Sequence, residues 1–301
     1  MASVAEWIEG ARPRTLPAAV APVAAGVGVT LDTGSTADGP QVALLAVMAL
    51  VVALALQVGV NYFNDYHDGV RGTDDVRVGP VRLVGQGLAT PTAVRRAAVG
   101  SLALGAVVGL ALIVLSGAWI MVPVGAAAVL AAYGYTGGSH PYGYLGLGEL
   151  FVFVFFGPVA VCGTTLVTGG QVWPLAAACS VPVGLLTVAI LVANNLRDRP
   201  LDAEVGKRTL AVRLGDRRTR GLFVGCMMAA FVLVAWVAIL TSPWALLAMT
   251  GAVPAVRAAQ LVLENAYGRG LIPVLQSTSL SLLLVGLGLG VGLGLGAGLA
   301  P

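Results

Sequence analysis

Hydrophobic residues fill the chain in long runs, and short polar stretches separate these runs from one end to the other. A helix that crosses a bilayer needs about 20 mostly apolar residues. Nine runs approach that length, at residues 15–31, 41–64, 93–116, 118–135, 147–167, 172–196, 221–240, 244–264 and 274–299. The pattern predicts an all-α integral membrane protein, with nine transmembrane helices that surround a central cavity and form one domain over residues 1–301.

The composition agrees with this prediction. Of the 301 residues, 57% are apolar and 10% are charged, whereas soluble domains carry about 25% charged residues. The three cysteines lie in apolar runs without CxxC spacing, which indicates small core residues rather than disulfides or metal ligands. The glycine-rich run near the C-terminus contains GxGxG patterns but follows no strand, so we expect a helix that packs closely on its neighbours.

The basic residues predict the orientation in the membrane. If the N-terminus is cytoplasmic, all 17 lysines and arginines fall in or next to cytoplasmic segments, and the outside loops hold none. The two polar loops predicted at residues 65–92 and 197–220 carry most of them. The positive-inside rule therefore places the N-terminus in the cytoplasm and the C-terminus outside. Residues 1–14 read as a short helix on the membrane surface.

One polar stripe stands out at the end of the second predicted span. Gln57, Asn61, Asn64 and Asp68 follow at helical spacing, so they share one face of a helix. Polar and ionisable side chains are expensive in a membrane helix and usually mark a functional site. The stripe therefore predicts a site at the cytoplasmic edge of this span.

A second cluster follows the sixth span, where Asn194, Asp198 and Asp202 are spaced i, i+4 and i+8. They share a face if the helix continues past Pro200, which allows at most a kinked continuation. Like the first cluster, this one has an Asn, an Asp four residues later, and basic residues beyond. We expect an internal duplication in which both clusters face one cavity from the cytoplasmic side.

Carboxylates on facing helices, with arginine and lysine nearby, suit Mg²⁺ bound to a diphosphate. At the mouth of an apolar bundle, this favours a long prenyl diphosphate, because metal binding assists the leaving group and the apolar cavity excludes water. Two other interpretations remain. The charges could be solvated loop residues, or the chain could be a secondary transporter, although transporters bind near the bilayer midplane.

The segments NDYHD, residues 64–68, and NLRDRPLD, residues 195–202, resemble the aspartate-rich motifs of the UbiA superfamily of intramembrane prenyltransferases. The similarity is greatest to the 1,4-dihydroxy-2-naphthoate polyprenyltransferase branch (MenA). It is carried by these motifs and by ARPRTLP at 11–17, DGVRGTD at 68–74, RVGPVRLV at 77–84, YTGG at 135–138, GLGE at 146–149 and GKRTLA at 206–211.

The resemblance implies a UbiA-like helical bundle in the cell membrane with its active site on the cytoplasmic side. It implies transfer of a polyprenyl group from polyprenyl diphosphate to 1,4-dihydroxy-2-naphthoate, with decarboxylation, to give demethylmenaquinol for menaquinone biosynthesis. Another aromatic acceptor, such as 4-hydroxybenzoate, is the alternative within the superfamily.

Candidate roles follow from the residue types. The Mg²⁺ ligands would be Asp68, Asp74, Asp198 and Asp202, with Asp75 as the alternative to Asp74. The diphosphate and substrate would be bound by Arg14, Asn64, Arg82, Asn194, Asn195, Lys207 and Arg208. Asp65 and Glu149 are the candidate bases for the acceptor's phenolic proton, and Glu149 could instead be a structural hydrogen-bond acceptor. His67 is expected to face the cytosol rather than bind metal.

Overall fold

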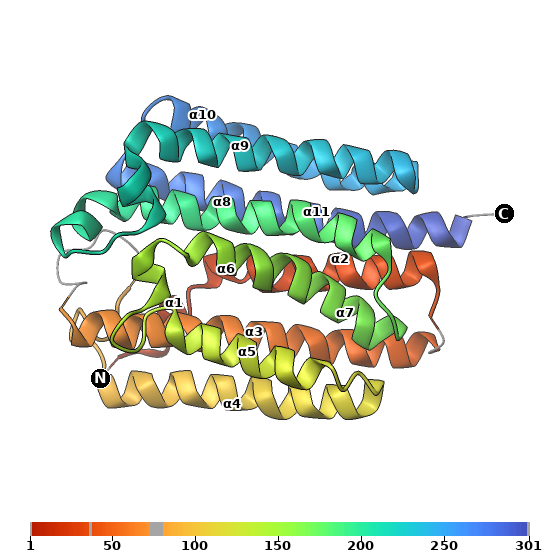
Figure 1. Ribbon diagram of the computed structural model, residues 1–301, viewed down its shortest axis with the longest axis horizontal. Coiled ribbons are helices and arrows are strands. Elements are labelled where there is room, and N and C mark those ends of the chain that lie inside the picture. Colours follow the sequence, from red (N-terminus) through yellow and green to blue (C-terminus); the bar gives the residue numbers. More distant parts are fainter. Residues whose placement is uncertain (1, 36–37, 73–80, 300–301) are drawn as a thin grey trace.

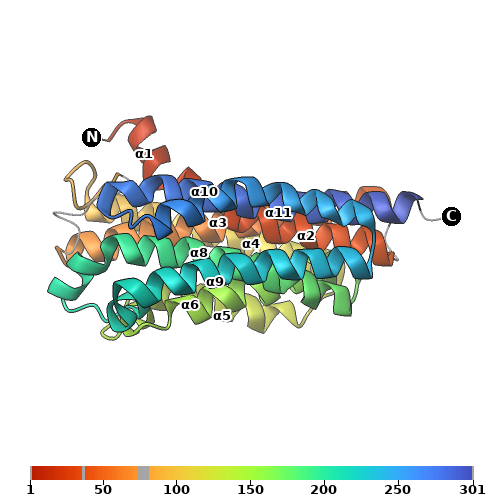
Figure 2. The ribbon, with the colours of Figure 1, turned by 90° about the horizontal axis from the view of Figure 1, so that it is seen from above.

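The computed structural model describes residues 2–35, 38–72 and 81–299, and this part of the chain contains helices and no strands. The long helices lie side by side along the longest axis, and the two termini lie at opposite ends (Figures 1 and 2). The elements are α1 (Val4–Gly10), η1 (Pro13–Thr15), α2 (Pro17–Thr33), α3 (Gly39–Val70), α4 (Pro91–Ser116), α5 (Met121–Gly134), η2 (Tyr142–Leu145), α6 (Gly148–Val154), the π-helical turn η3 (Phe155–Val159), α7 (Ala160–Gly169), α8 (Pro174–Glu204), α9 (Leu210–Leu240), η4 (Pro243–Gly251), α10 (Ala252–Leu263), η5 (Gly268–Leu271) and α11 (Ile272–Leu299).

Helices occupy all nine predicted spans, but not all are long enough to count as crossings. Among the described residues, seven helical segments have the length and hydropathy to cross a membrane. The N-terminal helices and α2, bent by 49° relative to each other, would make an eighth. The remaining segment, α5, is apolar but only 14 residues long. The structure thus confirms an all-helical bundle with several apolar spans.

The predicted polar loop at residues 197–220 was largely wrong. Helix α8 continues through Pro200 to Glu204, and α9 begins at Leu210, where the Thr209 side chain accepts a hydrogen bond from the Val212 backbone. A break at Gly215, with φ 75° and ψ 173°, separates the first turns of α9 from the rest. The eight basic residues of this stretch made it read as a loop, although side chains such as Ala211 and Arg220 are buried. The end of the second span was also misplaced, since α3 continues to Val70.

The glycine-rich helix α11 packs closely on α2, as its sequence predicted. A Cβ atom added to Gly28 would lie 2.5 Å from the Cα of Gly290, and one added to Gly286 would lie 2.4 Å from the Cα of Ala21. Real side chains do not fit at such distances. The two backbones therefore touch directly, which is the packing that small residues permit between membrane helices.

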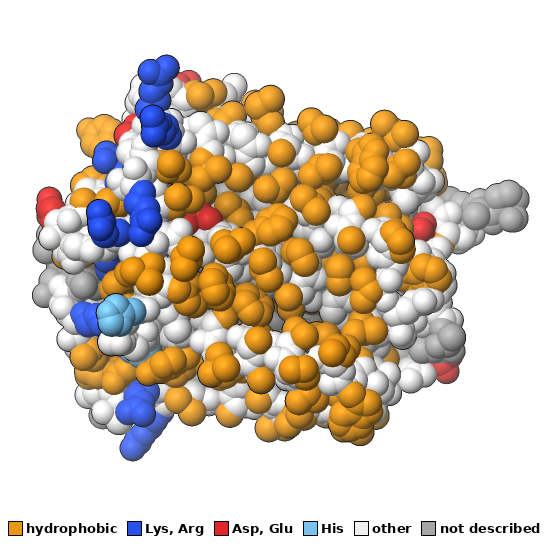
Figure 3. Space-filling view, in the orientation of Figure 1, with side chains coloured by type: hydrophobic (Ala, Val, Ile, Leu, Met, Phe, Trp, Pro, Cys, Tyr) orange, Lys and Arg blue, Asp and Glu red, His pale blue; other side chains and the backbone are white. Residues whose placement is uncertain are grey.

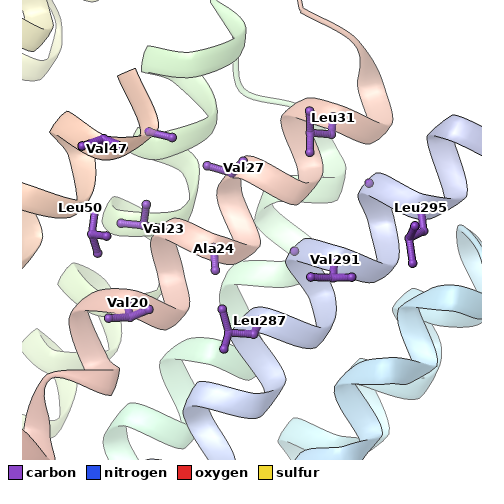
Figure 4. Close-up of a pocket in the computed structure, with 13 residues that line it drawn as sticks. Val20, Val23, Ala24, Val27, Leu31, Val47, Leu50, Leu287, Val291 and Leu295 are labelled. Carbon is purple, nitrogen blue, oxygen red and sulfur yellow. The ribbon is translucent and has the colours of Figure 1, made fainter. Parts of the chain in front are cut away.

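An open groove of about 530 Å³ lies beside this contact, between α2, α3 and α11 (Figure 4). Every side chain that lines it is apolar, so it offers no group to bind a diphosphate or a metal. Its lining residues are Val20, Val23, Ala24, Val27, Leu31, Ala46, Val47, Leu50, Leu287, Gly290, Val291, Gly294 and Leu295. The groove does not confirm the central cavity that the sequence predicted, and that cavity stays a prediction.

Charged side chains are distributed unevenly along the bundle. On the face shown in Figure 3, the lysines and arginines gather at the end where α8 gives way to α9, and hydrophobic side chains cover the middle. This is the distribution of a protein embedded in a bilayer. The end with the basic residues also carries the buried polar side chains described next.

Candidate active site

Asp68 lies near the end of α3 and is buried, with 4% of its surface exposed. Its Oδ1 atom accepts hydrogen bonds from the Tyr144 hydroxyl at 2.5 Å and from the Lys207 Nζ at 3.2 Å. The Lys207 ammonium also lies 4.5 Å from the centre of the Tyr144 ring. Three segments far apart in the sequence therefore meet at one carboxylate.

Tyr144 belongs to the short helix η2, in the segment between α5 and α6. Burial raises the pKa of its phenol, and the adjacent Asp68 carboxylate, with the hydrogen bond to it, raises that pKa further. The phenol is therefore protonated at neutral pH and donates to Asp68. Sequence reasoning missed Tyr144, although it lies between the YTGG and GLGE segments that carried the family resemblance.

The first cluster also fixes the segment at residues 136–138. The Thr136 hydroxyl donates to Asn64 Oδ1 at 2.9 Å. The Arg71 guanidinium donates to the carbonyl of Thr136 at 2.5 Å and to that of Gly138 at 2.7 Å. His67 is half-buried and lies against the Phe63 ring, at 5.5 Å between ring centres, and its expected cytosolic position stays a prediction.

The first two residues of the polar stripe on α3, Gln57 and Asn61, have a structural role. Gln57 and Asn61 both donate to the Thr15 hydroxyl, at 3.2 and 3.1 Å, and Asn61 also donates to the Ala11 carbonyl at 2.9 Å. These bonds attach the N-terminal segment to α3. The stripe that looked like one site therefore divides into an anchor and, from Asn64 onward, the cluster around Asp68.

Asp65 is almost fully buried and uses both carboxylate oxygens to hold a loop. Oδ2 accepts from the Leu83 backbone N–H at 2.8 Å, and Oδ1 accepts from that of Val84 at 3.1 Å. Arg12 is close enough to act electrostatically on this carboxylate. The two backbone bonds place the neighbouring Arg82, which is only 5% exposed. This arrangement makes Asp65 an anchor for the segment that bears Arg82.

The second cluster lies on α8, the helix with the largest buried share among the spans. Arg197 donates from Nε and Nη2 to the two oxygens of Asp198, at 2.7 and 2.8 Å, and from Nη2 to Asn194 Oδ1 at 2.7 Å. Asp198 and Asp202 are 4% and 5% exposed. The predicted shared face of α8 is therefore correct, and Arg197 is a further residue that the sequence reasoning did not assign.

The segment that follows the second cluster contacts the first cluster through Lys207. The Lys207 backbone N–H donates to the Asp202 carbonyl at 2.8 Å, while its side chain reaches Asp68. The Lys207 side chain thus connects the first cluster to the segment that directly follows the second.

Glu149 lies in the first turn of α6 and is 8% exposed. Its Oε1 accepts from Asn195 Nδ2 at 2.9 Å, and its Oε2 is buried without a hydrogen-bond partner among the described residues. Asn195 precedes Asp198 by three residues on α8. Along an ideal helix, the backbone of Asn195 is therefore about 4.5 Å further from the C-terminal end of α8 than that of Asp198.

Two candidate binding residues have exposed side chains. Arg14 is exposed, and its carbonyl accepts a hydrogen bond from the Ser279 hydroxyl at 2.6 Å. Arg208 is also exposed, and its backbone N–H donates to the Tyr144 carbonyl at 2.9 Å. Asp74 and its alternative Asp75 lie outside the described residues.

The donor set fits Mg²⁺ in chemistry. Asp68, Asp198 and Asp202 supply buried carboxylate oxygens, the ligand type that this hard cation prefers, and Mg²⁺ commonly takes only one or two protein carboxylates with substrate phosphates. Within the described ranges, no group of three or more His, Cys, Asp or Glu side chains converges as a preformed cage. Lys207 and Arg197 contact two of the carboxylates, so these cations would have to release them on metal binding.

Comparison with known proteins identifies the relatives of this chain. The model of the UbiA prenyltransferase family matches residues 19–270. The 1,4-dihydroxy-2-naphthoate octaprenyltransferase of Mycobacterium tuberculosis is 54% identical over 93% of this chain and 94% of its own. The Escherichia coli protein of the same name is 35% identical over 90% and 89%.

The fold is also found among solved structures. A UbiA homolog from Archaeoglobus fulgidus has a TM-score of 0.60 at 14% identity and covers 96% of this chain and 99% of its own. The structure of a UbiA homolog from the same organism bound to DMAPP and Mg²⁺ has a TM-score of 0.57 at 16% identity and covers 79% of each chain. At these identities the likeness concerns the fold alone.

Proposed function

The chain belongs to the UbiA prenyltransferase family, and we propose that it transfers a polyprenyl group from polyprenyl diphosphate to 1,4-dihydroxy-2-naphthoate with decarboxylation, forming demethylmenaquinol for menaquinone biosynthesis. The observation that carries this proposal is the 54% identity to a 1,4-dihydroxy-2-naphthoate octaprenyltransferase over nearly the whole chain. The contact of Lys207, from the segment that follows the second cluster, with Asp68 of the first supports it, because the reaction needs carboxylates and cations around one diphosphate.

The diphosphate would bind between α3 and α8. Mg²⁺, when bound, would neutralise the diphosphate and so assist its departure. Asp68, Asp198, Asp202 and Asp74 (or Asp75) would hold the metal. Lys207 and Arg82 would neutralise the remaining phosphate charge, because both are buried cations on segments tied to the clusters.

The other polar residues would orient the groups around the diphosphate. Asn64 and Asn194 lie in the first and second cluster, and each accepts a hydrogen bond that fixes its amide. Arg14 and Arg208, which are exposed, would contact the diphosphate or the acceptor carboxylate only from the rim of the site. Asp65 and Glu149 are the carboxylates available to take the acceptor's phenolic proton.

The apolar bundle would take the prenyl tail and exclude water from the allylic cation. Breaking the C–O bond leaves the electron pair on the diphosphate, and the electron-rich ring then forms the new C–C bond and loses CO₂. Residues 1–301 would form one domain with nine crossings in the plasma membrane, since α5 and the bent N-terminal pair would complete the count. The N-terminus and the site would be cytoplasmic and the C-terminus outside.

The purified protein tests the reaction directly. With Mg²⁺, a long polyprenyl diphosphate and 1,4-dihydroxy-2-naphthoate, it should release diphosphate and CO₂ in equal amounts, and chelation of Mg²⁺ should stop both. Product from 4-hydroxybenzoate, but none from 1,4-dihydroxy-2-naphthoate, would refute the acceptor assignment. Sustained turnover after chelation would refute the metal requirement.

Labelling tests the topology. In intact cells, an impermeant thiol reagent should modify Gly39→Cys, at the start of α3, from outside and should not modify Val205→Cys, after α8. Both positions are exposed in the structure. The reverse pattern would contradict the orientation.

A further inference from the structure

We propose that Glu149 and Asn195 form the subsite for a ring hydroxyl of the acceptor, and that Glu149 takes the proton of this hydroxyl during prenyl transfer. This inference rests on the proposed function and deepens it, because it chooses between the two carboxylates available as a base. It also assigns to Asp65 a different role, that of a positioning residue.

The hydrogen bonds of the two carboxylates differ in kind. Both oxygens of Asp65 accept from backbone N–H groups, at 2.8 and 3.1 Å, and those bonds fix the loop that carries Arg82. Each of these bonds stabilises the charged carboxylate, which opposes transfer of a substrate proton to it. Removing it would displace Arg82, whereas Glu149 holds no loop.

Glu149 has the features that a base for a bound hydroxyl needs. Oε1 is fixed by Asn195 Nδ2 at 2.9 Å, which orients the carboxylate. Oε2 is buried and has no partner within the part of the chain that the structure describes. A buried polar atom without a partner is costly, and most such atoms in native proteins are satisfied. A hydroxyl donor from a substrate would satisfy it.

The position of the pair is also suitable. Asn195 and Asp198 are three residues apart on one helix, so the backbone of Asn195 lies about one turn further into the bundle than that of Asp198. If the diphosphate binds at the level of Asp198, the allylic carbon beyond it extends toward the level of Asn195. The acceptor ring must approach that carbon, and its hydroxyl then comes within reach of Glu149.

The step balances without another reactant. Glu149 accepts the hydroxyl proton as the ring attacks the allylic carbon, since the phenolate is the better nucleophile. The C–O bond to the diphosphate breaks and its electron pair leaves with the diphosphate. After the ring loses CO₂, the electron pair of the broken C–C bond returns to the ring, and the proton passes back from Glu149 to the ring oxygen.

The test is Glu149→Gln, which keeps the size of the side chain and one acceptor oxygen for Asn195 but replaces the other oxygen by an NH2 donor and so removes the basicity. At neutral pH we expect kcat to fall at least about 100-fold, as for removal of a general base. The affinity for an unreactive polyprenyl thiodiphosphate in the presence of Mg²⁺ should remain within about twofold of wild type. The matched control is Glu204→Gln, at the exposed end of α8, which should behave as wild type.

The pH profile separates a base from a structural residue. A phenolic hydroxyl ionises in water near pH 10, so the rate of Glu149→Gln should rise about tenfold per pH unit toward that of wild type. A deficit that is equal at every pH would overturn the proposal and mark Glu149 as structural. Wild-type kcat in Glu149→Gln would overturn it as well.

Two further variants cover the case in which Glu149→Gln fails to fold. Glu149→Asp retains a base and should keep an activity between those of the wild type and Glu149→Gln. Asn195→Ala retains the base but loses its orientation, so kcat should fall only about tenfold, without rescue at high pH. Loss of activity in Glu149→Asp with unchanged thiodiphosphate binding would refute the role. Failure of the wild type itself to use 1,4-dihydroxy-2-naphthoate would instead refute the proposed function.

Discussion

The two aspartate clusters look alike in sequence, but their leading carboxylates are fixed in different ways. Asp68 on α3 is held by Tyr144 and Lys207, which lie 76 and 139 residues away along the chain. Asp198 on α8 is held by Arg197, its immediate neighbour, at 2.7 and 2.8 Å. In the described part of the chain, the Tyr144 and Lys207 contacts of Asp68 come from distant segments, and the Arg197 contact of Asp198 comes from its own helical turn.

The two clusters also differ in the burial of the helices that carry them. Helix α8 is the most buried of the spans, with 61% of its apolar window inside the protein against 33% for α3. The second cluster therefore lies on the more deeply buried of the two helices. The first is completed by the segments around Tyr144 and Lys207, so its geometry is the more sensitive to changes outside its own helix.

Loss of either carboxylate should have the largest effect, because both halves are needed to hold the metal and diphosphate. In Asp68→Asn and in Asp198→Asn we expect kcat/KM to fall at least about 10⁴-fold, or about 5.4 kcal/mol. The control is Asp38→Asn, an exposed carboxylate at the opposite end of α3, which should stay near wild type. Near-normal turnover in only one of the two site variants would show that one cluster suffices.

Removal of the cation that is paired with each leading carboxylate should destabilise the protein by different amounts in the two clusters. Arg197→Ala deletes three short side-chain bonds in a buried ion pair, and breaking such pairs costs about 3–5 kcal/mol. Lys207→Ala leaves the Tyr144 bond to Asp68 in place and should cost less. Thermal unfolding in detergent measures this difference, with the exposed Arg269→Ala as the control. A larger loss in Lys207→Ala would reverse the comparison.

The smallest expected effect tests the dependence of the first cluster on a distant segment. Tyr144→Phe deletes one hydrogen bond to a carboxylate, worth about 1.5–3 kcal/mol. We expect kcat/KM to fall about 10- to 100-fold. Tyr142→Phe is the matched control, because the Tyr142 hydroxyl donates to the Ala131 carbonyl on α5, away from both carboxylates. Equal losses in the two variants would mean that the segment, not the bond to Asp68, matters.

The sequence alone was sufficient for an all-helical bundle with several apolar spans and for the polar side chains that share a helical face. Apolar runs determine where helices form, and spacing i, i+4 determines which side chains share a face, as Asn194, Asp198 and Asp202 do. Both are local properties. The close contact of α2 with α11 was also predictable in kind, because glycine permits it.

Long-range pairing was not predictable from the same patterns. Nothing local indicates that Tyr144 donates to Asp68 or that Asp65 holds the backbone at Leu83. The charged stretch after α8 was misread as a loop, since its helix is fixed by tertiary burial of a few side chains such as Ala211 and Arg220. Gln57 and Asn61 were assigned to a site because periodicity identifies a polar face but not its partner.

The central claim is that both clusters act on one metal-bound diphosphate, and a double-mutant cycle tests it most directly. The affinity of an unreactive polyprenyl thiodiphosphate is measured at saturating Mg²⁺ for wild type, Asp68→Asn, Asp198→Asn and the double variant. Residues that share a ligand couple, usually by about 0.5–3 kcal/mol, whereas independent sites add within about 0.5 kcal/mol. We predict a coupling free energy above about 1 kcal/mol between the two substitutions in thiodiphosphate binding. Additive losses would contradict the account.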